Sequence, residues 1–91
     1  MDVVAFEEGL AHANGEYRAA FEAAENEQAL RAANARLVGP QGSLTKLLRG
    51  MRDLPADRRK EFGARSNALK ESIQEAFRAR LTALEQAERM L

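Results

Sequence analysis

A long helical stripe at the end of the chain constrains the fold more than any other feature of the 91-residue sequence. Residues 55–91 contain no proline after Pro55, and their apolar side chains recur mainly at steps of three, four and seven. This spacing is typical of one face of an amphipathic helix. The stripe consists of Phe62, Leu69, Ile73, Ala76, Phe77, Leu81, Leu84 and Leu91. A helix of about 35 residues spans roughly 50 Å, so it needs partners along most of its length.

Two shorter segments precede this return helix and can lie along it. A leading helix is predicted from about residue 3 to 24, where apolar residues from Phe6 to Ala24 share one face. The first arm of a hairpin is predicted over 26–54. The turn "DLPAD" is then the tip of the hairpin, and 55–91 run back along the arm.

The stretch "LVGPQGSLTKLL" at residues 37–48 interrupts the first arm. Gly39 is a suitable helix stop, and Pro40 prevents simple continuation, so we expect a break over 39–43. Asn26 is expected to cap the helix before the break, and Ser43 the helix after it.

Together these segments predict an all-α fold. It is an antiparallel helical hairpin, or coiled-coil arm, with an additional N-terminal helix, in a single domain over residues 1–91. Apolar residues form 45% and charged residues 31% of the chain, which is typical of globular or coiled-coil domains. No strand pattern occurs in the sequence. Whether the leading helix folds back on the arm or swings free is left open.

The net charge of zero hides a basic middle segment. Residues 1–30 hold seven acids and one base, residues 31–70 ten bases and three acids, and residues 71–91 three bases and four acids. A local excess of positive charge favours contact with a polyanion. Alternatively, the oppositely charged segments pair with one another when the chain folds, and composition alone favours this alternative.

The sequence carries no convincing motif for catalysis, a cofactor or a metal ion. It has no cysteine, and its single histidine, His12, lacks ligand partners. Ser43 and Lys46 match the Ser-x-x-Lys pattern of acyl-enzymes, but no second motif of that class follows. The Gly39–Gly42 loop lacks the spacing of a phosphate-binding loop. We therefore expect no enzymatic activity of the chain on its own, no cofactor and no metal site.

Nothing in the sequence indicates a membrane or export. No apolar run approaches the roughly 18 residues of a spanning helix. The N-terminus, "MDVVAFEEGL", carries acids where a secretion signal carries bases. We therefore expect a cytoplasmic protein.

From Asn26 to about residue 88 the chain resembles the N-terminal helical domain of bacterial phenylalanyl-tRNA synthetase alpha subunits. The resemblance rests on "LVGPQGSLTKLL" followed by "DLPADRRKEFGARSNALKESIQEAFRAR". The matching positions are Gly39, Gly42, Leu44, Thr45, Leu54, Pro55, Arg58, Gly63, Asn67 and Lys70. Between the two glycines the family usually places two basic residues, where this chain has Pro40 and Gln41.

The resemblance implies a coiled-coil arm that packs on the outer corner of tRNA and performs no chemistry. The catalytic domain of such a synthetase lies elsewhere in the protein, so the remaining synthetase domains or subunits are implied partners. The candidate tRNA-binding residues near the hairpin tip are Lys46, Arg49, Arg52, Arg58, Arg59, Lys60, Arg65 and Lys70. For any one of the arginines, a solvated or ion-paired surface role is the simpler interpretation.

Three further alternatives remain open from the sequence. The apolar stripe over 62–91 could make the chain a protein-interaction or self-association module without nucleic-acid binding, including a homo-oligomer. Gly63 could mark a close approach of two helices. Asn67 could be a polar position that sets the register of a coiled coil.

Overall fold

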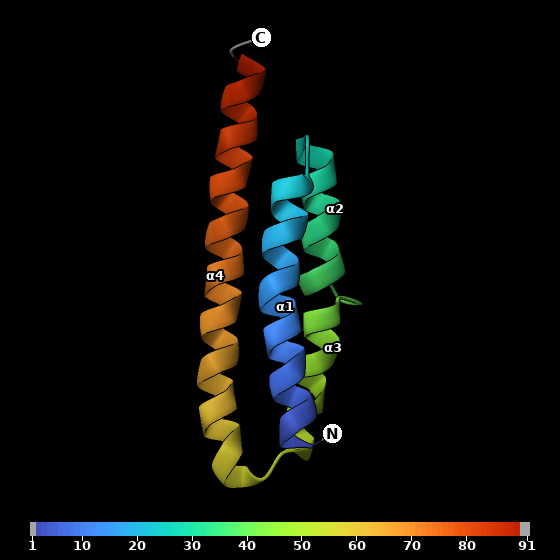
Figure 1. Cartoon of the computed structure of the whole chain (residues 1–91), viewed down its shortest axis with the longest axis vertical. Coiled ribbons are helices and arrows are strands. Elements are labelled where there is room, and N and C mark those ends of the chain that lie inside the picture. The colour runs from blue at the N-terminus through green and yellow to red at the C-terminus, as the bar shows by residue number, and fades with distance from the viewer. Residues whose placement is uncertain (1, 90–91) are drawn as a thin grey trace.

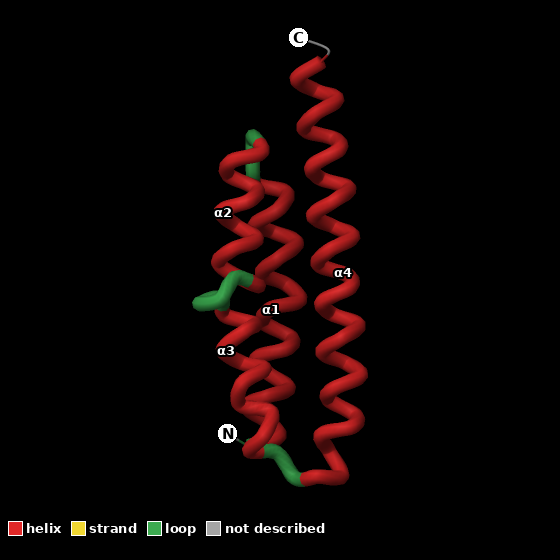
Figure 2. Tube along the Cα trace, turned by 180° about the vertical axis from the view of Figure 1, so that it is seen from behind, coloured by secondary structure: helices red, strands yellow, loops and turns green. Residues whose placement is uncertain are grey.

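The computed structural model describes residues 2–89, and the all-α prediction is confirmed. The helices are α1 (Val3–Ala23), α2 (Glu27–Val38), α3 (Ser43–Arg49), a 3-10 helix η1 (Gly50–Asp53) and α4 (Ala56–Arg89). No strand occurs within residues 2–89 (Figure 2). The predicted stripe ends at Leu91, which lies outside the described residues.

The helices form three rods in an elongated bundle of 53 × 19 × 18 Å. The second rod, α2 followed by α3, runs antiparallel to α4, and the tip of this hairpin lies at one end of the molecule (Figure 1). α1 runs parallel to α4, with its N-terminus near the tip, and it packs against α2, α3 and α4 (Figure 1). The leading helix therefore folds back on the arm and converts the hairpin into a three-rod bundle.

Aromatic side chains fix α1 against α4 at two levels. The Phe6 and Phe62 rings meet edge to face with centroids 5.2 Å apart, and the Phe21 and Phe77 rings do so at 6.1 Å. Equal numbers of residues separate the two contacts on both helices, which fits a parallel pair in a constant register. Edge-to-face pairs add to the burial of apolar area.

The apolar stripe of α4 is covered within the chain. Phe62, Leu69, Ile73 and Leu84 are buried, and the intervening Phe77 is half-buried against the same core. Val4 is the one large apolar side chain that is exposed among residues 2–89. The described part of the stripe therefore has apolar partners within the chain.

The joint between α2 and α3 is built on two glycines. The N–H of Gly39 donates to the carbonyl of Ala35 at 3.0 Å, and the N–H of Gly42 donates to the carbonyl of Gly39 at 2.8 Å. A Cβ on Gly39 would lie 2.5 Å from the oxygen of Ala35, and one on Gly42 would overlap the carbonyl of Leu37. Both positions thus exclude larger residues by sterics.

One helix cap matches the prediction and one does not. The Asn26 side chain accepts a hydrogen bond from the N–H of Ala29 at 2.8 Å, which confirms the cap of α2. The predicted cap at Ser43 is wrong, because α3 begins at Ser43 itself and Gly42 holds the capping position without a side-chain hydrogen bond. The tight backbone turn that requires Gly42 moves the helix start one residue earlier than a serine cap would allow.

Candidate nucleic-acid interface

Charged residues are segregated around the axis of α4. Residues spaced by three, four or seven share one side of a helix. By this rule one flank of α4 carries Lys60, Asn67, Lys70, Gln74 and Arg78. The acids of α4 before residue 80 fall on the neighbouring part of the helix surface, and these are Asp57, Glu61, Glu71 and Glu75. The two sides adjoin, because Asp57 precedes Lys60 by three residues and Glu71 follows Asn67 by four, but no acid lies three, four or seven residues from Lys70.

The tertiary structure turns this flank toward the second rod. A hollow of about 520 Å³ lies between α3 and α4, and it is lined by Val38, Leu44, Thr45, Leu48, Arg49, Lys70 and Gln74. The hollow thus brings two of the predicted site residues, Arg49 and Lys70, to one place. A smaller depression of about 380 Å³ shares Val38 and Gln74 with this hollow and includes Arg78. We refer to Arg49, Lys60, Asn67, Lys70, Gln74 and Arg78 as the cationic flank.

Arg49 is oriented by the joint between α2 and α3. Its Nη2 donates to the carbonyl oxygen of Pro40 at 3.1 Å. The carbonyl of Pro40 lies in a turn without helical hydrogen bonds, and the guanidinium of Arg49 supplies it with a donor. The joint thus fixes the position of one cation of the flank.

Arg59 holds the hairpin tip together. Its Nε donates to the carbonyl of Leu54 at 3.0 Å, and its Nη2 donates to the carbonyl of Arg52 at 3.0 Å. The carbonyl of Arg52 belongs to η1, and that of Leu54 belongs to the turn between η1 and α4. The structure thus gives Arg59 an intramolecular role in the turn.

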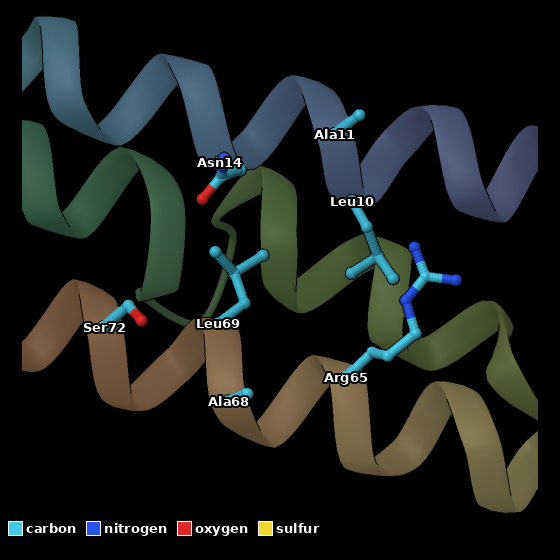
Figure 3. A pocket seen from close by; sticks show the side chains of 7 residues that line it. All are labelled: Leu10, Ala11, Asn14, Arg65, Ala68, Leu69 and Ser72. Atoms are coloured by element: carbon cyan, nitrogen blue, oxygen red, sulfur yellow. The ribbon is translucent and has the colours of Figure 1, made fainter.

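Arg58 and Arg65 have partners within the chain as well. Arg58 pairs with Glu61 at 3.0 Å, and Arg65 pairs with Glu7 of α1 at 3.3 Å. Both guanidinium groups also lie over the Phe62 ring, at 5.2 and 5.0 Å from its centroid. Figure 3 shows Arg65 reaching from α4 toward α1, beside a depression between these two helices. Arg65 therefore lies away from the hollow beside Lys70.

The remaining predicted site residues are exposed cations. Within residues 2–89 the side chains of Lys46, Arg52, Lys60 and Lys70 make no hydrogen bond or ion pair with protein groups. Lys46 and Arg52 do not line the hollow between α3 and α4. Gln74 and Arg78 were missed from the sequence, although their spacing of four and eight residues from Lys70 on the same helix was a usable signal.

Two sequence interpretations of α4 are wrong. A Cβ placed on Gly63 would meet no atom within 4 Å, so this glycine does not mark a close approach of helices. Asn67 is exposed and sets no register, because Ser66 and Leu69 are the α4 residues that face the core there. Asn67 is thus exposed, whereas Gly63 is half-buried with free space around it.

Neither a metal-binding cluster nor a membrane-spanning helix occurs in the described part of the chain. Across residues 2–89, no three His, Cys, Asp or Glu side chains come together as a possible metal site. Over the same range, every helix is too short or too polar to span a bilayer.

Comparison with known proteins identifies the family to which the chain belongs. The family model described as "Aminoacyl tRNA synthetase class II, N-terminal domain" matches residues 25–90. The chain therefore belongs to the N-terminal domain family of class II aminoacyl-tRNA synthetases, as its resemblance predicted. No solved structure matches the chain significantly.

Curated relatives of the chain include alpha subunits of phenylalanine–tRNA ligase. The phenylalanine–tRNA ligase alpha subunit of Bordetella parapertussis is 43% identical over 68 residues, which are 75% of this chain and 20% of that protein. The same subunit of Cupriavidus necator is 41% identical over 70 residues, or 77% and 20% of the two chains. That of Rhodospirillum centenum is 40% identical over 75 residues, or 82% and 21%. The chain spans about a fifth of the length of these relatives.

Proposed function

We propose that this chain is a non-catalytic arm that binds tRNA through its cationic flank. The observation that carries the proposal is the separation of charge around α4. Lys70 lies beside Arg49 of α3 and has no acid three, four or seven residues away on α4, and Lys60 lies further along the same side of that helix. Phosphate groups dominate the affinity of proteins for nucleic acids, and unpaired ammonium groups are suited to neutralise them.

The choice of tRNA as the ligand comes from the relatives. They are named phenylalanine–tRNA ligase alpha subunits, and this chain aligns with a part of them. The other parts of such a synthetase are the second class of partner that we propose. Folded RNA is recognised mostly through shape, phosphates and 2′-hydroxyls, which suits a rigid helical rod.

Stacking of bases on aromatic rings is not part of the proposal. Phe62 is fully buried, and the half-buried Phe77 packs on Phe21. The cationic flank itself contains no aromatic residue. Binding should therefore depend on phosphates and be steeply salt-dependent.

A titration with a phenylalanine-tRNA transcript at about 50 and about 200 mM salt tests the proposal. We expect binding at low salt and a steep loss at high salt. Replacing both Lys60 and Lys70 by Gln should lower the slope of log K against log salt by about 0.7–0.9 for each phosphate that is no longer neutralised. Arg59 is unsuitable for this test because its removal would disturb the hairpin tip.

Arg18→Gln is the control for the charge that each lysine substitution removes, since Arg18 is exposed on α1 and lines a depression between α1 and α4. It removes one charge and should change the binding much less. Absence of binding at low salt would contradict the proposal. Equal affinities of the double lysine variant and the unmodified chain would contradict the placement of the interface on the cationic flank.

A further inference from the structure

Gly63 lies inside α4 without a packing reason. Glycine within a helix is less stable than alanine because it loses more conformational freedom on folding. The structure explains other glycines: a Cβ on Gly9 would come within 2.7 Å of Leu47, and Gly39 and Gly42 are crowded by backbone carbonyls. Around Gly63 there is no atom within 4 Å of a Cβ position. Nothing inside the described bundle therefore requires a glycine here.

The surroundings of Gly63 are cationic. Lys60 precedes it by three residues, Asn67 follows it by four and Lys70 by seven, so all three project from the same side of the helix. Gly63, which is half-buried, consequently leaves the helix backbone without a side chain between two lysines, and no acid lies three, four or seven residues from it. A Cβ would be the first protein atom that a ligand meets at this point.

We propose that the sugar–phosphate backbone of RNA crosses α4 at Gly63. The missing side chain lets the strand approach the helix closely enough for Lys60 and Lys70 to reach phosphates on either side, while Asn67 can bond to a phosphate or a 2′-hydroxyl. This inference rests on the proposed function and adds the point where the strand meets the helix. Charge complementarity selects a polyanionic strand as the occupant.

Gly15 provides a matched comparison. It also lies inside a helix, and a Cβ there would also meet no atom within 4 Å. Its neighbours at three and four residues are Ala11, His12, Arg18 and Ala19, which form no cationic cluster. Gly15→Ala should therefore stabilise its helix as Gly63→Ala does, while it leaves the cationic flank unchanged.

The test measures stability and RNA affinity for Gly63→Ala, Gly63→Leu and Gly15→Ala. Both alanine variants should raise the melting temperature by about 4–8 °C, because alanine favours the helix. Gly63→Ala should nevertheless weaken binding of the phenylalanine-tRNA transcript about tenfold, the equivalent of one charge-assisted hydrogen bond. Gly63→Leu should weaken it further, and Gly15→Ala should bind like the unmodified chain.

The outcomes separate the two proposals. If the unmodified chain binds the transcript and Gly63→Ala binds equally well, the strand does not cross at Gly63, and the inference alone is overturned. If the unmodified chain does not bind at low salt, the proposed function fails and the inference fails with it. If the Gly63→Ala variant is more stable but binds the transcript more weakly, the close approach of the strand to α4 is supported. Unfolding is then excluded as the cause of the weaker binding.

Discussion

Arg80 binds the carbonyl oxygen of Ala24 through its Nη2 atom at 2.8 Å, across 56 residues of sequence. Its Nε also donates to the carbonyl of Phe21 at 3.0 Å. These carbonyls close α1, where the last turn has no helical donors left. A positive charge at this end also complements the helix dipole. A single side chain from α4 therefore satisfies the C-terminal end of the leading helix.

Replacing Arg80 by Met should lower the free energy of unfolding by about 1.5–3 kcal/mol, because two or more backbone acceptors lose a charged donor. Urea unfolding followed by circular dichroism measures the change. The control is Arg78→Met, since Arg78 is exposed and should contribute less than about 0.5 kcal/mol. Equal losses for the two variants would mean that the contact of Arg80 with α1 adds no stability.

Ser66→Ala should stabilise the chain by about 1 kcal/mol. The Ser66 side chain is 2% exposed, and its Oγ has no hydrogen-bond partner. A buried hydroxyl without a partner costs free energy, and alanine is also the better helix former. The exposed Ser72 on the same helix is the control, where alanine should gain only about 0.5 kcal/mol from helix propensity. Destabilisation by Ser66→Ala would refute the prediction.

Gly42→Ala should destabilise the joint between α2 and α3 by about 1–3 kcal/mol, the usual range for overpacking. The added methyl group would overlap the carbonyl of Leu37, which belongs to the backbone and cannot rotate away. Thermal unfolding compares this variant with Gly15→Ala, which has free space and should be stabilised by up to about 1 kcal/mol. A neutral effect at Gly42 would show that the loop relaxes easily.

Phe6→Ala should cost about 3–5 kcal/mol, since Phe6 is fully buried against Phe62. This is a large share of the roughly 5–15 kcal/mol that stabilises a typical small domain. Val4→Ala is the control in the same helix, because Val4 is 62% exposed and should change stability by no more than about 0.5 kcal/mol. A fully folded Phe6→Ala chain with unchanged urea midpoint would show that α1 is not part of the cooperative unit.

Much of the fold could be predicted because its signals are local. The spacing from Phe62 to Leu84 identifies one face of α4, and burial of that face follows from the hydrophobic effect. The cap at Asn26 involves an atom three residues away, so sequence alone suffices for it. The prediction of Ser43 as a cap was wrong, because the backbone turn at Gly42 depends on contacts with α2. Residue preferences carry no information about such contacts.

The sequence by itself determined the helices, their apolar faces and the basic middle segment, since these depend on residues that are at most a few turns apart. Only the tertiary structure decided which neighbour each face meets. It packed α1 against both other rods, paired Arg65 with Glu7, and turned the side of α4 with Lys70 toward Arg49. The rotation of each packed helix depends on the fit of all side chains at its contacts. Periodicity identifies the apolar face of a helix, but it does not identify the helix that packs on that face.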